Sequence, residues 1–347
     1  MKARLRGSPL TPAHLILAIL AVLVAWFLWE KSHRKTRPMH GGIHNDKSLP
    51  YSNEYELYHN DLSLCSKKVR ACMAQLGVAY KSHHVDLIET GSYEVISRHY
   101  LAVNPAGLLP ALVHNGHPIY ESHEIIAYVA QRFDGPQERA LLPPVEADRA
   151  LMQLWVDRAS LEGDDPVKGL RDSAANCAAI LTTPLFCAGV KTIPVHRILE
   201  GLLFHRLRFR PVLFLLLKFR GLDHFTEIAP LMTQLDRGRD QMGEHLAALE
   251  HHLEQNGPYI VGQQLTLADI SWLVIFERLV EADWVDFFLQ PCSRPAIAAY
   301  WKRLKSTPAY QIGIEQHRHP TVSAATALIQ QKKVLDPSFH ARLEGRG

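Results

Sequence analysis

The spacing of apolar residues divides the chain into three regions. Residues 13–29 form an almost unbroken apolar run, residues 51–135 alternate short apolar runs with a helical pattern, and residues 143–320 carry helical periodicity alone. Apolar runs of four or five residues have the length of strands, whereas apolar residues that recur every three or four positions indicate helices. The pattern predicts a membrane-type helix, then an α/β unit, then an all-α unit.

The α/β unit is expected over residues 51–135. Gly77 is placed to stop its first helix, and Asn115-Gly116 is typical of a tight hairpin between two strands. Ser122 stands where the N-cap of the last helix belongs. The order strand, helix, strand, hairpin, helix is that of a thioredoxin-like fold. The predicted strands are Glu54–Tyr58, Lys81–Val85, Ala111–His114 and Pro118–Tyr120, and the predicted helices are Cys65–Gly77 and Ser122–Phe133.

The region 143–320 is predicted to be all-helical. Thr266-Leu267-Ala268-Asp269 precedes an apolar run and resembles a capping box, with Asp in place of the usual Glu. The tail, residues 321–347, is short and polar and is expected to be partly mobile. The clearest helices are predicted at Ala147–Leu161, Gln234–Asn256, Leu267–Ala282 and Ala296–Ser306.

An insertion over residues 193–222 interleaves leucine and phenylalanine with arginine and lysine. One interpretation is a buried helix pair whose long cations solvate one face. The other is a basic, aromatic surface that lies against a membrane or covers a hydrophobic pocket. The pattern favours neither. A second transmembrane pass is not expected, because Pro211 and the arginines interrupt the apolar run.

Residues 1–50 are predicted to be a membrane anchor and a linker. As a helix, Ala13–Trp29 would rise about 25 Å, slightly less than the ~30 Å hydrocarbon core of a bilayer, and its two tryptophans suit a membrane interface. A cleaved signal peptide is the alternative, but the run does not end in an Ala-x-Ala-like site. The polar stretch Ser32–Pro50 is interpreted as a linker. Basic residues flank the run at Lys2, Arg4 and Arg6 before it and at Lys31, Arg34, Lys35 and Arg37 after it.

The excess of one basic residue after the run favours a single-pass protein whose remaining domains are cytoplasmic.

Composition limits the partners and metal sites that can be expected. The chain has 347 residues, 47% of them hydrophobic, and a net charge of +3, so it can bury a core but no nucleic-acid partner is expected. Its five cysteines lack the paired spacings of zinc sites and are sparse for a disulfide scaffold. No His-Glu-x-x-His motif occurs among the twenty histidines, so no metal is expected.

Candidate chemistry lies at Ser63–Ser66, where the first predicted strand ends and a helix begins. Unpaired N–H groups and the helix dipole favour negative charge there, and can lower the pKa of a cysteine in the first turn. In a plainer interpretation, Ser63 only caps the helix and Cys65 packs as a small hydrophobe. Lys67, Lys68 and Arg70 could favour a thiolate, but lysines at this position more often face water.

Further motifs give that stretch a context. Asn104–Pro110 has the form Asn-Pro-x-Gly-x-x-Pro, Glu121-Ser122 precedes a helix, and the capping box follows in the helical region. In this order and at these separations, over residues 51–320, the motifs resemble those of the glutathione S-transferases. The Ser63–Arg70 stretch resembles the zeta-class transferases and the related reductive dehalogenases. The resemblance implies a thioredoxin-like domain followed by the helical domain of that family.

The resemblance also implies that glutathione is the co-substrate. Ser63 falls at the position of the serine that hydrogen-bonds the glutathione sulfur, and Cys65 at the position of an additional cysteine. The serine would help to form the thiolate that attacks an electrophile. Cys65 would either form a mixed disulfide with glutathione, which permits thiol exchange or reductive removal of a leaving group, or remain a silent neighbour.

Four other residues would bind the rest of the tripeptide. Pro110 would be the cis proline of the family, leaving the backbone of Leu109 free to pair with the glutathione backbone. Glu121 and Ser122 would receive the amine and the carboxylate of the γ-glutamyl end.

The leading hypothesis is a membrane-anchored glutathione transferase that acts on a hydrophobic electrophile, with isomerase, thiol-transferase or reductive-dehalogenase activity as variants. The alternative is a non-catalytic glutathione-binding scaffold at the membrane. The expected partners are glutathione, a hydrophobic small molecule and a membrane, and a homodimer is compatible with the resemblance. The anchor and the insertion depart from the compact soluble plan of the family, so the substrate class stays open.

Overall fold

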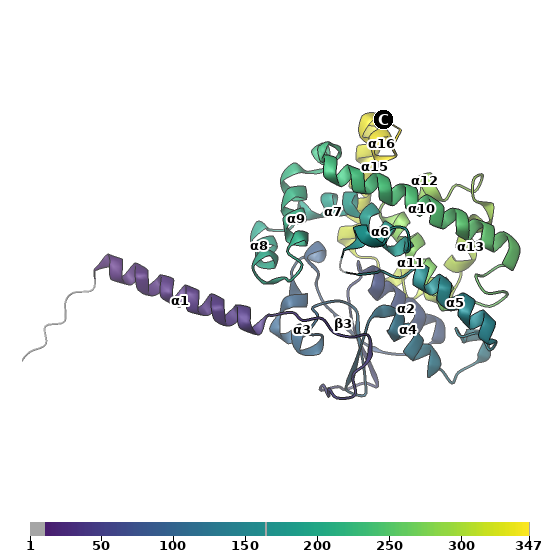
Figure 1. The fold of residues 1–347 in the computed structure, drawn as a ribbon, viewed down its shortest axis with the longest axis horizontal. Helices are drawn as coiled ribbons and strands as arrows, with labels where there is room; N and C mark the ends of the chain where they lie inside the picture. The colour runs from purple at the N-terminus through teal and green to yellow at the C-terminus, as the bar shows by residue number, and fades with distance from the viewer. Residues whose placement is uncertain (1–10, 164, 347) are drawn as a thin grey trace, which may run out of the picture.

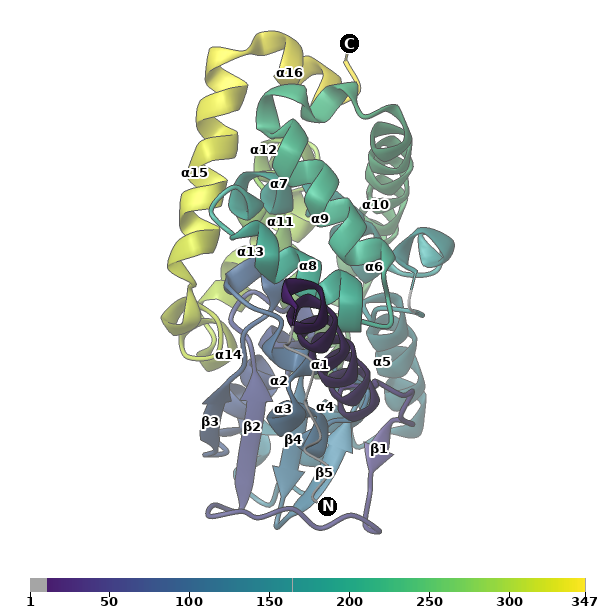
Figure 2. The same ribbon diagram turned by 90° about the vertical axis from the view of Figure 1, so that its left-hand side faces the viewer.

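The computed structural model describes residues 11–163 and 165–346. Figure 1 shows two packed domains, from which one long helix, α1 (Pro12–His33), projects. The sheet lies in the lower domain and helices fill the upper one, and the turned view in Figure 2 shows the same division. The predicted fold class, an α/β domain followed by an all-α domain and preceded by one apolar helix, is confirmed.

A five-stranded sheet organises the N-terminal domain, with strand order β1-β5-β4-β2-β3. β2 and β3 are parallel because a helix connects them, and the other neighbouring strands are antiparallel. The strands are β1 (Gly42–Ile43), β2 (Tyr55–His59), β3 (Lys81–His84), β4 (Ala111–His114) and β5 (His117–Tyr120).

Local sequence signals explain the connections around this sheet. Asn115 and Gly116 have φ values of 49° and 86°, as the mirror-image hairpin turn requires, and Gly77, at φ 73°, ends α2 (Leu64–Leu76). α2 packs beside α4 (Ser122–Gln131), and the short α3 (Arg98–Val103) lies between β3 and β4 in the chain. The predicted strands and helices of this domain are confirmed, with their ends moved by one or two residues.

Residues 32–50 do not form a free linker, so that prediction is wrong. The segment runs along the N-terminal domain and contributes β1, which pairs with the far end of β5. The backbone N–H of Arg37 donates to the carbonyl of Pro105 at 2.9 Å, and that of Leu49 donates to the carbonyl of Gly116 at 2.8 Å. Strand β1 has only two residues, too few to produce an alternating pattern.

The C-terminal domain is arranged around α11 (Leu267–Glu281), almost all of whose side chains are buried. The predicted capping box is present, because the Thr266 N–H donates to the Asp269 carboxylate at 2.7 Å. The other helices of this domain, apart from the insertion and the tail, are α5 (Glu146–Arg158), α6 (Ala174–Leu181), α7 (Thr183–Val190), α10 (Ala229–Asn256), α12 (Val285–Phe288), α13 (Pro295–Lys305) and α14 (Pro308–Gln311). The four predicted helices correspond to α5, α10, α11 and α13, whereas α6, α7, α12 and α14 were not predicted.

The insertion forms two helices, α8 (Val195–Phe204) and α9 (Phe209–Arg220). Their inner faces bury Ile198, Phe214 and Leu217. Their outer faces expose leucine, valine and phenylalanine to solvent. The interpretation as a buried helix pair is therefore right for one face only.

The tail beyond residue 320 was expected to be partly mobile, and the structure shows two packed helices instead. α15 (Pro320–Leu335) lies against α7, and α16 (Pro337–Leu343) follows it. Val322, Ala325 and Ile329 are buried at helical spacing. Ser323 and Thr326 within the stripe, and the polar run Gln330–Lys333 after it, gave the segment its polar composition, which concealed this narrow apolar stripe.

Helix α1 has 22 residues, so it is about 33 Å long. Within residues 11–163 and 165–346 it is the helix long and apolar enough to cross a membrane, a test that an N-terminal signal sequence also passes. Its apolar side chains are exposed on all sides. The predicted basic flank at Lys2, Arg4 and Arg6 lies outside the described residues.

Candidate active site

Ser63 is the N-cap of α2, at the junction of the two domains. Its Oγ accepts a hydrogen bond from the backbone N–H of Ser66, at 3.2 Å. Because this contact uses a lone pair of the hydroxyl, the Ser63 proton stays available for a second partner. A group bound next to Ser63 would meet that proton and the positive end of the α2 dipole.

The helical domain holds this turn in place. Arg278 of α11 donates to the carbonyl of Leu62, the residue before the cap, and Glu281 of α11 forms an ion pair with Lys67. Both Lys67 and Glu281 are buried. The expectation that Lys67 faces water is therefore wrong, and the position of the active-site turn depends on a contact between the two domains.

Cys65 lies in the first turn of α2 and is partly exposed. Burial raises the pKa of its thiol, an effect larger than the opposing influences of the Lys68 ammonium and the Ser122 hydroxyl. The expectation that the helix N-terminus makes this thiol acidic is therefore not met. The structure brings Cys65 and Ser122 together, but burial keeps the pKa of the cysteine above its ordinary value.

Lys68 is buried beneath this turn. Its ammonium donates to the Ala159 carbonyl at 3.2 Å and to the Ser160 hydroxyl at 2.9 Å, both at the end of α5. Burial lowers the pKa of Lys68 to about 8, although the nearby Cys65 thiolate would raise it. The sequence analysis expected this lysine to face water. Its partners lie in the other domain, so the local sequence gave no sign of them.

The peptide bond between Leu109 and Pro110 is cis, as predicted. The preceding turn is fixed by Asn104, whose side chain donates to the Leu108 carbonyl at 2.8 Å, and by the Tyr100 hydroxyl, which donates to the same oxygen at 2.5 Å. Within the part of the chain that the structure describes, the backbone N–H and C=O of Leu109 have no hydrogen-bond partner. They remain available to a ligand.

Glu121 and Ser122 lie at the N-terminus of α4. Glu121 is the N-cap of α4 and Ser122 is its first helical residue, so the prediction that Ser122 caps this helix is wrong. Glu121 has φ 65° and ψ 122°, a conformation that residues with a side chain rarely adopt, and its side chain is exposed. Such strain is found where the surroundings fix a residue for function.

Comparison with known proteins identifies the two domains. Residues 57–137 match the model of the glutathione S-transferase N-terminal domain, and residues 232–303 match that of the C-terminal domain. The chain belongs to the glutathione S-transferase superfamily. It is 22% identical to glutathione S-transferase F9 of Arabidopsis thaliana over 256 residues, which cover 73% of this chain and 94% of the relative.

The expected likeness to reductive dehalogenases is confirmed as well. The chain is 23% identical over 275 residues to the tetrachloro-p-hydroquinone reductive dehalogenase of Sphingobium chlorophenolicum, which covers 74% of this chain and 94% of that protein.

Solved structures share the fold of this superfamily member. The beta-etherase LigF from Sphingobium sp. strain SYK-6 superposes with a TM-score of 0.60 and 21% identity, covering 76% of this chain and 100% of that one. Glutathione transferase F2 from Populus trichocarpa gives a TM-score of 0.54 and 19% identity, covering 76% and 98%.

The strained backbone at Glu121 leads to a testable prediction. Replacing Glu121 with glycine should stabilise the fold by about 1 kcal/mol, since glycine adopts positive φ without steric cost. The same change should weaken glutathione binding, because the carboxylate is lost. Urea unfolding and calorimetric titration with glutathione measure the two effects.

Glu124→Gly is the matched control. Glu124 is also exposed in the first turn of α4 but has ordinary helical geometry. Glycine there should destabilise the fold by about 1 kcal/mol and leave glutathione binding unchanged. If Glu121→Gly destabilises the protein as much as Glu124→Gly does, the backbone at Glu121 is not strained.

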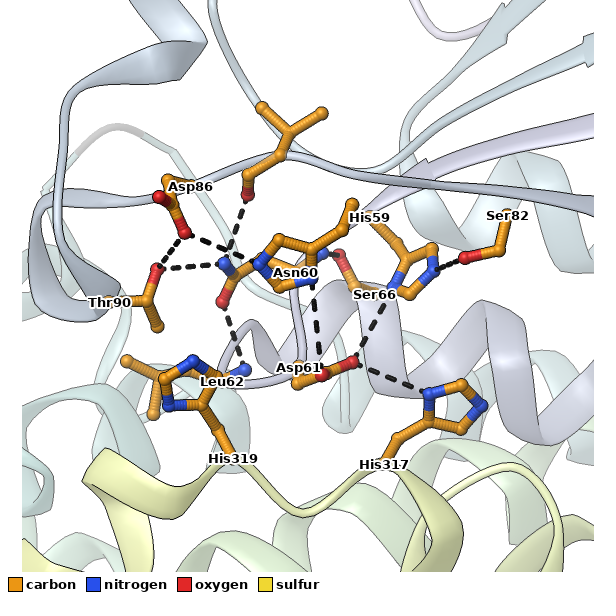
Figure 3. A network of polar contacts seen from close by, with 12 residues as sticks. His59, Asn60, Asp61, Leu62, Ser66, Ser82, Asp86, Thr90, His317 and His319 are labelled. Atoms are coloured by element: carbon orange, nitrogen blue, oxygen red, sulfur yellow. Dashed lines mark hydrogen bonds and ion pairs between the residues drawn. The ribbon is translucent and has the colours of Figure 1, made fainter.

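A polar cluster lies where the end of β2 meets the segment before α15 (Figure 3). His59, Asp61 and His84 have nitrogen and oxygen atoms within 4.8 Å of one another, a spacing that could hold a metal ion. The buried guanidinium of Arg70 lies 3.1 Å from His59 Nδ1 and 3.4 Å from Asp61 Oδ1. His317 Nδ1 lies 3.5 Å from the same Asp61 oxygen. Because Arg70 already supplies the positive charge, we interpret the cluster as a structural junction between the domains.

This cluster predicts acid lability. Burial, followed by the Arg70 charge, lowers the pKa of His59 to about 3, whereas an unfolded histidine has a pKa of about 6.5. The unfolded chain therefore binds more protons between these values, and stability that is complete above about pH 6.5 falls as the pH is lowered, by up to about 1.4 kcal/mol per unit. Asp61, whose pKa is lowered to about 2 mainly by its contact with His317 and the Arg70 charge despite burial, adds a further loss below about pH 4.

The measurement is the unfolding midpoint in urea as a function of pH. His59→Asn should flatten the decline, since asparagine can still accept from Arg70 but does not titrate. His251→Asn, at an exposed position of α10, is the control and should leave the decline unchanged. Identical pH profiles for the wild type and His59→Asn would contradict this assignment.

Proposed function

We propose that the protein is a glutathione-dependent transferase in which Ser63 activates the glutathione thiol. The observation that carries this proposal is the geometry of Ser63, a helix N-cap whose hydroxyl accepts a hydrogen bond and donates to none of the described residues. Donation from that hydroxyl and the positive end of α2 stabilise a thiolate sulfur, which then attacks an electrophile. The raised pKa of Cys65 supports glutathione, and not this cysteine, as the first nucleophile.

The remaining predicted residues form the rest of the glutathione site in this proposal. The unpaired backbone groups of Leu109 pair with the cysteinyl backbone of the tripeptide, as an added strand does. The exposed carboxylate of Glu121 receives the γ-glutamyl amine. The hydroxyl and backbone N–H of Ser122, in the first turn of α4, receive the carboxylate.

Cys65 takes a second role in this proposal. The Cys65 thiol, once its proton is removed, can attack the glutathione sulfur of an adduct, so that an S–S bond forms and the bond from that sulfur to the substrate breaks. The substrate leaves with the electron pair and takes up a proton, and a second glutathione thiol then reduces the mixed disulfide on Cys65 and forms oxidised glutathione. The similarity to a reductive dehalogenase supports this variant. The Cys65→Ser variant distinguishes these activities, because it should abolish exchange with disulfide substrates and leave conjugation to aryl halides intact.

The substrate in this proposal is a hydrophobic electrophile and the protein is held at a membrane by α1, with the two domains on the cytoplasmic side. The apolar run at 13–29 rises about 25 Å within a helix of about 33 Å, so the apolar part nearly spans the ~30 Å core of a bilayer and the polar last turn lies at its edge. A hydrophobic substrate would partition into that bilayer. Resistance of the full chain to alkaline carbonate extraction tests the span, because a processed signal sequence would leave a protein that washes off.

A non-catalytic glutathione-binding protein is the rival function. Retention on glutathione-agarose tests binding, and a panel of aryl halide, disulfide and maleyl-type substrates tests turnover. Retention with turnover of at least one class supports the transferase. Retention without any turnover supports the scaffold, and no retention contradicts both.

A further inference from the structure

The outer faces of α8 and α9 form an apolar stripe. Outside α1, fourteen large hydrophobic side chains are exposed within the described residues, and six of these lie on the two insertion helices. Their spacing of three or four residues places them along one side of each helix. The six are Leu199 and Leu203 on α8, and Phe209, Val212, Leu216 and Phe219 on α9.

The stripe lies on the side of the molecule from which α1 leaves. Figure 1 shows α8 and α9 at the left edge of the body, next to the base of α1, and Figure 2 looks directly onto that side with all three helices in front. A bilayer crossed by α1 would therefore face the outer surfaces of α8 and α9.

Specific contacts fix the base of α1 to α8. The Arg34 guanidinium pairs with the Glu200 carboxylate at 2.6 Å and covers the Phe204 ring at 4.4 Å. The Phe27 and Phe204 rings lie 5.8 Å apart. α1 and α8 are thus joined directly, and the direction of α1 is set by the body that carries the stripe.

A second clamp comes from the N-terminal domain. Arg98, on α3, pairs with Glu30 and lies 3.9 Å from the Trp29 ring. Trp29 is the last residue of the apolar run, where the headgroup layer would begin. α3 and α8 therefore lie at the level of that layer.

Charge around the stripe indicates the kind of surface that covers it. Residues 193–222 contain six lysines and arginines but one acidic residue, Glu200. Arg208, just before α9, and Arg220, its last residue, are exposed and flank the stripe; Arg220 also forms an exposed pair with Glu227 at 3.8 Å. Apolar side chains that enter the interface, surrounded by cations that meet phosphates, are the features of an amphipathic helix on an anionic bilayer.

We propose that the outer face of α8 and α9 rests in the headgroup layer of the anionic bilayer that α1 spans. The protein then contacts the membrane at two places, through α1 and through the insertion helices. This inference rests on the proposed membrane span. It adds a lipid-binding surface to the insertion and places the body with α9 against the membrane.

The test uses the full chain with Cys65→Ser and Cys292→Ser, reconstituted into vesicles. An environment-sensitive fluorophore is attached at Phe219→Cys on α9 or at Val334→Cys on α15, positions that are 74% and 80% exposed. Vesicles contain phosphatidylcholine alone or with phosphatidylglycerol. We expect the probe at 219 to shift to the blue and its quenching by aqueous iodide to fall several-fold in anionic vesicles, while the probe at 334 stays unchanged.

Three results would overturn the proposal. Equal quenching at 219 and 334 means that α9 faces water. Protection at 219 that disappears when the protein-to-lipid ratio is lowered means that a second copy of the chain covers the stripe. Protection of the same size in neutral vesicles means that anionic lipid is not recognised. Carbonate extraction of the same vesicles reports on α1 separately, so failure of the span is distinguished from failure of the docking surface.

Discussion

Replacing Ser63 with alanine should lower glutathione transferase turnover about 100-fold, because the donor to the developing thiolate is lost. The KM for glutathione should change little, since Leu109, Glu121 and Ser122 bind the rest of the tripeptide in the proposed site. The variant should also lose about 1 kcal/mol of stability, because Ser63 caps α2. Steady-state kinetics with the best substrate of the panel measure the first effect, and urea unfolding measures the second.

Two control variants separate these effects. Ser63→Thr keeps both the hydroxyl and the cap and should retain most of the activity. Ser97→Ala removes an equivalent cap from α3, where the Ser97 hydroxyl accepts from the Tyr100 N–H at 3.1 Å, and should cost stability without a large loss of turnover. Wild-type turnover in Ser63→Ala, or an equal loss in Ser97→Ala, would contradict the role given to the Ser63 hydroxyl.

Replacing Glu281 with alanine should destabilise the protein by about 3–5 kcal/mol. Glu281 and Lys67 are 9% and 3% exposed, and the alanine variant would leave the Lys67 ammonium buried without its partner. Burial already lowers the pKa of Lys67, so part of the cost would be relieved by deprotonation at high pH. The unfolding midpoint in urea, measured at neutral and alkaline pH, shows both effects.

The double variant Lys67→Met with Glu281→Leu is the matched test of this pair. Two apolar side chains of similar size should recover part of the lost stability, because the buried Lys67 charge is removed. The recovery is not complete, since buried Arg278 also loses Glu281, 3.4 Å away, and keeps, among the described residues, only its bond to the Leu62 carbonyl. Glu227→Ala breaks the exposed pair with Arg220 at 3.8 Å and should change stability by less than about 1 kcal/mol. If Glu281→Ala is as mild as Glu227→Ala, the Lys67 pair does not hold the active-site turn.

Features that depend on neighbouring residues could be predicted from the sequence. The Asn115-Gly116 turn, the end of α2 at Gly77 and the Thr266–Asp269 capping box each involve a few adjacent residues, and all three are present. The cis bond at Pro110 was predicted from a family motif and is also present. The element order then sufficed for the fold class.

Features that depend on distant residues could not be predicted. Lys67 was assigned to solvent because its partner, Glu281, is 214 residues away in the sequence. Strand β1 exists only because β5 provides an edge for it, and α15 is fixed by its contact with α7. In each case a polar or short segment is ordered by a surface that the local pattern does not contain.

In the candidate site, too, local features could be predicted from the sequence and features that depend on distant residues could not. Residue type and order brought Ser63, Leu109 and Glu121 to attention. The acidity of Cys65 was misjudged, because the α2 dipole acts locally whereas burial is set by the packing of both domains, and burial has the larger effect. The strain at Glu121 had no sequence signal at all, since glycine would be the usual residue at that backbone conformation.

The central claim is that Ser63 promotes ionisation of the glutathione thiol. Its most direct test is an ultraviolet titration of glutathione bound to the wild-type protein and to Ser63→Ala, which follows thiolate absorbance against pH. We expect the thiolate to appear at a pH well below the ordinary thiol pKa of about 8.5 in the wild type, and to return toward that value in Ser63→Ala. Titration curves that coincide for the two proteins would contradict the account.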